Sequence, residues 1–177
     1  HYDSLLIDHR SPDLARDGSK VVEVILDICN KEEIQNKYDK FAMLLPTAPF
    51  RKIKSIKMGL SLLDEKTDSV VSLGPFNFPP QMAVSLEPDS KVLLPMLDNS
   101  PLLSGNTRSQ DQINYLRPNG SFYFSRIRSF VKNKSFFLGE VKGFEMSNFG
   151  STDIDTGDDL MFAQTLIDLN MADSDFL

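Results

Sequence analysis

The sequence predicts an α/β layer fold with a mostly parallel sheet. The short apolar run 41–45 has the composition of a strand that is buried on both faces of such a sheet, and 69–73 is the next expected strand. Segments in which apolar residues recur at helical spacing alternate with these runs. Strands that alternate with helices are typical of parallel sheets covered by helices.

The elements follow in order along the chain. Ser19 can cap a first helix, and Pro46 and Pro49 end the first strand abruptly. Helical spacing resumes from Arg51, and Thr156 is a suitable start for the last helix. Besides 41–45 and 69–73, we expect strands at 91–94 and 121–127 and within 136–146, and we expect the tail 173–177 to fray.

Residues 74–106 form a long, Pro-rich excursion between these elements. Such excursions are usually functional or form interfaces. Its large apolar side chains would be a liability on a free surface, so they cover the domain's own core or contact a second subunit. These residues are Phe76, Phe78, Met82, Leu93, Leu94, Met96 and Leu97.

Composition excludes several classes of protein. The chain has 177 residues and a net charge of −6, and no basic stripe that could bind the phosphates of a nucleic acid. No apolar run approaches the ~18 residues of a membrane span. Two His and one Cys argue against a zinc site and against Ser–His–Asp or Cys–His catalysis. We expect Cys29 to be a buried thiol in a cytoplasmic protein, and His1 to begin a piece of a longer chain.

The most informative motif is the pair Asp153 and Asp155. In an extended segment the two carboxylates project from one face, with roughly 7 Å between their Cα atoms. Oxygen ligation by few protein groups suits Mg²⁺, although D-x-D also occurs in solvated acidic turns. Thr156 and Asp159 have capping-box spacing. Because Pro46–Arg51 also follows a predicted strand, we expect both segments in one site.

Four stretches, in order, resemble the acylneuraminate cytidylyltransferase family. The family patterns are R-P-x-x-L-A-x-D, L-L-Q-P-T-S-P-L-R, R-x-Q-D followed by N-G-x-x-Y, and S-I-D-I-D-T-x-x-D-x-x-x-A. The matching residues are 10–17, 44–51, 108–111 with 119–123, and 152–163.

The resemblance implies a three-layer, Rossmann-like nucleotidyltransferase domain over 1–177 that forms a homodimer through 74–106. It implies that CTP and a nonulosonic (sialic-type) acid give the CMP-acid and pyrophosphate. Asp153 and Asp155 would be the catalytic pair that binds Mg²⁺. The implied nucleotide-binding residues are Arg10, Asp17 and Ser19, and the implied substrate-binding residues are Arg51, Arg108, Gln110, Asn119 and Tyr123. From the residues alone, Tyr123 could instead be core, and Arg51 a solvated first-turn residue.

The chain departs from the family in two respects. The N-terminal strand and the Gly-, Lys- and Arg-rich phosphate loop are absent from the sequence. Leu45 stands where sialic-acid members carry Gln, so we expect a preference for a deoxygenated acid unless Gln81 or Gln110 replaces that amide. Two alternatives remain. The protein could be a truncated or degenerate relative that binds a sugar or a partner without catalysis. It could also be a nucleotidyltransferase for sugar 1-phosphates, although such an enzyme would not be expected to keep the motif at residues 119–123.

Overall fold

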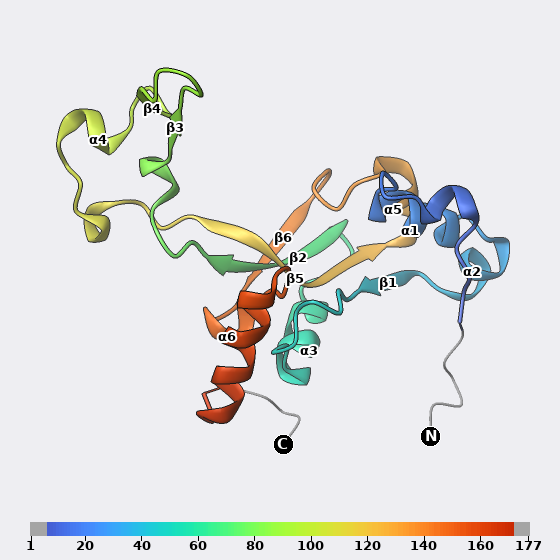
Figure 1. Ribbon diagram of the computed structural model, residues 1–177. Helices are drawn as coiled ribbons and strands as arrows, with labels where there is room; N and C mark the ends of the chain where they lie inside the picture. The colour runs from blue at the N-terminus through green and yellow to red at the C-terminus, as the bar shows by residue number, and fades with distance from the viewer. Residues whose placement is uncertain (1–6, 172–177) are drawn as a thin grey trace. The chain divides into compact units, whose positions relative to one another are not determined.

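The computed structural model describes residues 7–171, and the expected frayed tail at 173–177 lies outside them. The chain forms two compact units. Figure 1 labels the helices and strands of the chain. Unit 1 contains the described residues up to Met43, together with Gly59–Val71 and Tyr123–Lys142. Unit 2 contains Leu44–Met58, Ser72–Phe122 and the described residues from Gly143 onward.

The main sheet is mixed, and the α/β class is confirmed. Its strand order is β1–β5–β2–β6, and β5 runs antiparallel to β1. Hydrogen bonds from Asp68 N to Glu140 O and from Met146 N to Leu73 O advance in the same direction along β2 and β6, so these two strands are parallel. The strands are β1 (Lys40–Met43), β2 (Ser69–Pro75), β5 (Leu116–Arg126) and β6 (Val141–Glu145).

The first strand differs from its prediction. It ends at Met43 rather than 45, and half-buried Phe41 and Met43 alternate with exposed Lys40 and Ala42. Within the described sheet β1 is an edge strand that pairs with β5 alone, and its alternating burial leaves one face exposed. The strand predicted at 69–73 is confirmed as β2 and is buried along most of its length.

Three α-helices belong to unit 1, and α1 contacts both of the others. The Ser19 cap was predicted wrongly: its hydroxyl donates to Asp13 O (3.1 Å), and Lys20 is the cap residue. The Lys20 N–H donates to Glu23 Oε2 (3.0 Å), which stabilises the first turn. The helices are α1 (Val21–Cys29), α2 (Glu32–Lys37) and α5 (Ile127–Asn133), with a 3₁₀ turn, η1 (Pro12–Ala15), before them.

Cys29 is buried at the end of α1, as the sequence predicts, and is 2% exposed. Burial disfavours the thiolate and raises the pKa of Cys29 to about 11. At about pH 8 we therefore expect native protein to react with iodoacetamide far more slowly than urea-unfolded protein. Mass spectrometry of timed samples measures this, and equal rates in both states would contradict the buried position.

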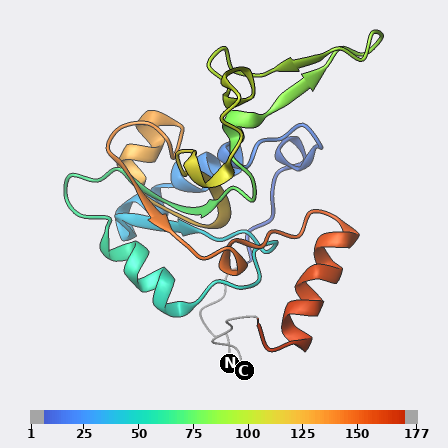
Figure 2. The same ribbon diagram turned by 90° about the vertical axis from the view of Figure 1, so that its left-hand side faces the viewer.

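The excursion in unit 2 contains a second sheet. The strand predicted at 91–94 is found as β4 (Leu93–Pro95), and it pairs antiparallel with β3 (Val84–Leu86), which the sequence did not predict (Figure 2). Short helical segments precede and follow this hairpin along the chain. They are η2 (Pro80–Met82), α4 (Pro101–Ser104) and η3 (Ser109–Asp111), and α4 contacts η2.

The predicted later helices are confirmed as α3 (Ile53–Ser61) and α6 (Gly157–Asp168). The capping box is also confirmed: Thr156 Oγ1 accepts from Asp159 N, and Asp159 Oδ2 accepts from Thr156 N (2.8 Å). A turn, η4 (Phe149–Ser151), precedes this cap. Across residues 7–171, no helix has the length and apolar character needed to cross a membrane.

Candidate functional site

The structure brings together the two segments that were expected to form one site. Ile154 N donates to Thr47 O (2.9 Å), which joins the turn after β1 to the segment that carries the two aspartates. The Ile154 side chain packs against a buried cluster formed by Phe50 and by Ala163 and Leu166 of α6. Both segments are therefore fixed to the same small core.

The aspartate segment is not the strand that its pattern suggested. Residues 152–155 follow η4 as irregular backbone, and the backbone N–H of Ile154 binds a loop carbonyl instead of a neighbouring strand. Asp153 is half-buried, whereas Asp155 is exposed. Asp155 N donates to Asp159 Oδ2 (3.2 Å), so the cap of α6 also holds the backbone of Asp155.

The Asp153 carboxylate has the properties of a cation ligand. Its Oδ1 atom is buried, and no hydrogen-bond partner for it exists among residues 7–171. A buried carboxylate oxygen without a partner is costly, and a bound cation would remove that cost. No group of three or more His, Cys, Asp or Glu side chains in the described residues could hold a metal. Binding of Mg²⁺ by Asp153 and Asp155 therefore stays a prediction, in which the ion would complete its shell with water or substrate oxygens.

Gly120 lets Asp153 and Leu45 approach the backbone of β5. Its φ of +74° is in the left-handed region that favours glycine. A methyl group on Gly120 would lie 3.2 Å from Leu45 Cδ1 and 3.6 Å from Asp153 Oδ2. Leu45, half-buried, therefore lies on the same patch of backbone as the aspartate carboxylate.

Asn119 lies inside the protein and is 1% exposed. Its Oδ1 atom accepts from Ser72 Oγ (2.5 Å) and Ser121 N (3.2 Å). Its Nδ2 atom donates to Ser151 Oγ (2.9 Å) and contacts Met146 Sδ (3.4 Å). These four contacts use the whole amide, so here Asn119 shapes the site rather than presenting a free group to a ligand.

Arg51 also binds the protein itself. Its guanidinium donates to Ala48 O (3.0 Å), Ser121 O (3.0 Å) and Leu45 O. It thereby ties the turn at 45–51 to β5, and desolvation lowers its pKa. The alternative that Arg51 is a solvated residue in the first turn of a helix is therefore wrong. Contact of Arg51 with a substrate stays a prediction.

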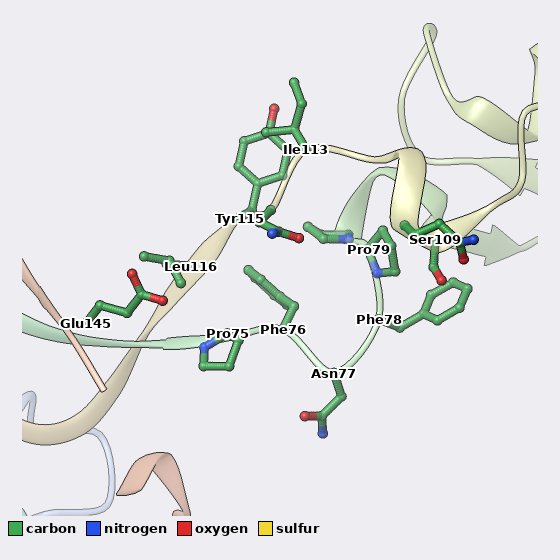
Figure 3. A pocket seen from close by; sticks show the side chains of 13 residues that line it. Pro75, Phe76, Asn77, Phe78, Pro79, Ser109, Ile113, Tyr115, Leu116 and Glu145 are labelled. Atoms are coloured by element: carbon green, nitrogen blue, oxygen red, sulfur yellow. The ribbon is translucent and has the colours of Figure 1, made fainter. Parts of the chain in front are cut away.

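Gln110 is one of the residues that line a cavity of about 350 Å³. Figure 3 shows this cavity, with Phe76 and Tyr115 among its labelled lining residues. Arg108, two residues before Gln110, is exposed and forms an ion pair with Asp111 (3.8 Å). Gln81 donates its Nε2 to Ile113 O (2.8 Å). The cavity is lined by Pro75, Phe76, Asn77, Phe78, Pro79, Pro80, Ser109, Gln110, Ile113, Asn114, Tyr115, Leu116 and Glu145.

The remaining predicted site residues belong to unit 1. Arg10 and Asp17 are exposed, and Ser19 is half-buried. Tyr123 is half-buried on β5, with its ring centroid 5.1 Å from that of Phe136. The aromatic packing agrees with the core interpretation of Tyr123, and ligand contacts of all four residues stay predictions.

Sequence reasoning missed Ser72, Gly74 and Ser151, which surround Asn119. Serine and glycine are common in every kind of segment, and these positions lie far apart in the chain. Asn119 itself was predicted as a site residue only through the resemblance to the cytidylyltransferase family.

Solved structures share the fold. A CMP:2-keto-3-deoxy-manno-octonic acid synthetase complexed with CTP superposes with a TM-score of 0.55 at 12% identity, over 87% of this chain and 70% of that one. A 4-diphosphocytidyl-2C-methyl-D-erythritol synthase from Anaerococcus prevotii also superposes with a TM-score of 0.55, at 10% sequence identity. The superposition covers 85% of this chain and 67% of that one. At these identities the likeness shows the α/β fold alone.

No protein-family model matches the chain. A CMP-N,N'-diacetyllegionaminic acid synthase of Legionella pneumophila is 29% identical over 163 residues, which cover 91% of this chain and 68% of that protein. N-acylneuraminate cytidylyltransferases of Streptococcus agalactiae and Escherichia coli are 26% and 29% identical, over 86% and 89% of this chain. The chain spans only 35% and 36% of their lengths. These relatives, a CMP-N,N'-diacetyllegionaminic acid synthase and N-acylneuraminate cytidylyltransferases, confirm the resemblance found in the four motifs.

Proposed function

We propose that the protein is a cytidylyltransferase that joins CTP and a nonulosonic acid to give the CMP-acid and pyrophosphate, with Mg²⁺ held by Asp153 and Asp155. One observation carries the chemical part of the proposal. The buried Asp153 Oδ1 has no partner among residues 7–171, at the point where the turn 45–51 meets the aspartate segment.

The chain's own residues would mostly position the reactants. Phosphoryl transfer of this kind needs alignment and charge stabilisation more than a nucleophilic side chain. A bound Mg²⁺ would supply charge stabilisation at the phosphates. The cavity that Gln110 lines has a volume in the range of small-molecule sites, but neither Leu45 nor Asp153 lines it. Arg10, Asp17 and Ser19 are the proposed contacts to the nucleotide.

The direct test is an assay of the full-length protein with CTP, Mg²⁺ and a panel of nine-carbon acids. Release of pyrophosphate that depends on both CTP and one acid supports the proposal. If calorimetry detects binding of an acid but no acid gives pyrophosphate, the protein is the non-catalytic relative. The single, buried Cys29 fits a reaction in the reducing cytoplasm.

A homodimer through the excursion is part of the proposal. Exposed fractions of 59% for Leu86, 55% for Leu93 and 73% for Met96 leave apolar surface that a second copy would cover. We expect light scattering at micromolar concentration to give twice the mass of the chain. Leu86→Glu should give monomers, whereas Ser85→Glu, on the neighbouring position of β3, should not. A monomeric parent protein would rule out this interface.

The acceptor preference follows from Leu45. Leu45 offers no hydrogen bond to a sugar hydroxyl or amide, which would lose roughly 1–3 kcal/mol if docked there without a partner. We therefore expect a higher kcat/KM for a deoxygenated acid of the legionaminic or pseudaminic type than for N-acetylneuraminic acid. Leu45→Gln should shift the ratio of the two values about tenfold toward N-acetylneuraminic acid. A parent protein that clearly prefers N-acetylneuraminic acid would contradict this role of Leu45.

A further inference from the structure

A buried hydrogen-bond cluster joins β2, β5 and the turn that leads into Asp153. Ser72, Asn119 and Ser151 form it and are at most 3% exposed. Asn119 accepts from Ser72 Oγ and donates to Ser151 Oγ, which in turn donates to Ser147 O (2.8 Å). We call these three residues the Asn119 cluster.

The position of Ser151 is also fixed by close packing. A methyl group on Gly74 would lie 2.3 Å from Ser151 Oγ and 2.6 Å from Ser151 Cβ, far closer than atoms can approach. Ser151 therefore lies directly on the backbone of β2, with no space on that side. Asp153 follows two residues later.

We propose that Asn119 and Ser151 are positioning residues for the Asp153 carboxylate. This inference rests on the proposed function, because it assumes that Asp153 holds the metal. A carboxylate oxygen that is buried without a partner would turn toward water if its segment could relax. The Asn119 cluster prevents that relaxation by fixing Ser151 from β2 and β5. Groups that orient a metal ligand in this way influence metal affinity without touching the ion.

The test measures binding of Mn²⁺, as a paramagnetic probe, by electron paramagnetic resonance on the full-length protein, with and without CTP. Ser151→Ala removes the acceptor for Asn119 Nδ2, and we expect the Kd for Mn²⁺ to rise about tenfold or more. The matched control is Ser125→Ala, which also truncates a buried serine. Ser125 lies on β5 and is bonded to Ser69 Oγ (2.9 Å) and Asp68 O (3.0 Å). It should lower Tm without changing the Kd for Mn²⁺.

A second variant keeps the test decisive if Ser151→Ala folds poorly. Gly74→Ala adds a methyl group that must displace Ser151, and its expected effect on the Kd for Mn²⁺ is the same. The enzyme assay gives a second measure for both variants. The fold increase in the Mg²⁺ concentration needed for half-maximal rate should exceed the fold decrease in kcat at saturating Mg²⁺.

Asp153→Asn separates the two ways of failing. If Mn²⁺ binding is unchanged in Asp153→Asn, Asp153 is not a metal ligand, and both the metal site and the positioning role are wrong. If Asp153→Asn abolishes binding while Ser151→Ala and Gly74→Ala behave like Ser125→Ala, the metal site stands and the positioning role alone is overturned.

Discussion

Asp155→Asn is expected to lower kcat/KM by about 10²-fold or more, and Asp153→Asn by at least as much, because a metal contributes several kcal/mol to such reactions. Each change keeps the size of the side chain and removes one negative charge. The effect of Asp153→Asn should exceed that of Asp155→Asn, since the Asp153 carboxylate is half-buried and its Oδ1 has no alternative partner in the described residues. Initial rates of pyrophosphate release at saturating Mg²⁺ measure both.

The same substitution a few residues later is the control. Asp158 is an exposed, first-turn carboxylate of α6, so Asp158→Asn should stay within about threefold of the parent rate. Equal losses for all three variants would indicate that the rate depends on the charge of the whole segment rather than on a defined metal site. Unchanged rates in Asp153→Asn and Asp155→Asn would show that the pair is a solvated acidic turn.

Arg51→Met should destabilise the protein by about 3 kcal/mol, a fall in Tm of roughly 10 °C for a chain of this size. The change leaves three backbone carbonyls, those of Leu45, Ala48 and Ser121, without their guanidinium donors. Arg51→Lys should recover only part of the loss, because one ammonium group cannot reach three acceptors in this fork arrangement. Thermal unfolding followed by circular dichroism measures the difference.

A charge-matched control separates the turn from general electrostatics. Lys54 is exposed on α3, and Lys54→Met should change Tm by less than ~2 °C. If Arg51→Met were as mild as Lys54→Met, the three carbonyls would be satisfied by water and Arg51 would be available for an anionic substrate after all.

Local patterns in the sequence predicted local structure well. The cap formed by Thr156 and Asp159 needs only a three-residue spacing, and the strand β2 needs only a run of β-branched and small residues. The pair Asp153 and Asp155, whose binding of a metal stays a prediction, was selected from the same kind of local spacing. The prediction that residues 152–155 form a strand was wrong. The backbone N–H of Ile154 binds the carbonyl of Thr47, about a hundred residues earlier in the chain, and no local pattern reveals such a partner.

The non-local parts of the site could not be predicted from one sequence. The hydrogen bond between Asn119 and Ser151 joins positions that are 32 residues apart. The hydrogen bonds of the Arg51 guanidinium depend on the conformation of the turn 45–51 and on its position beside Ser121. β3 was missed because Val84-Ser85-Leu86 is too short for a periodic signal and gains its order by pairing with β4.

The full use of the Asn119 amide has a consequence for how related sequences can vary. Its oxygen and nitrogen bind different partners, so no single replacement at 119 can satisfy Ser72, Ser151 and the backbone of Ser121 together. Relatives that change residue 119 should therefore also change residues 72 and 151, and a side chain at 74 should occur only where 151 has become smaller. An alignment of many relatives in which these positions vary independently would contradict this coupling.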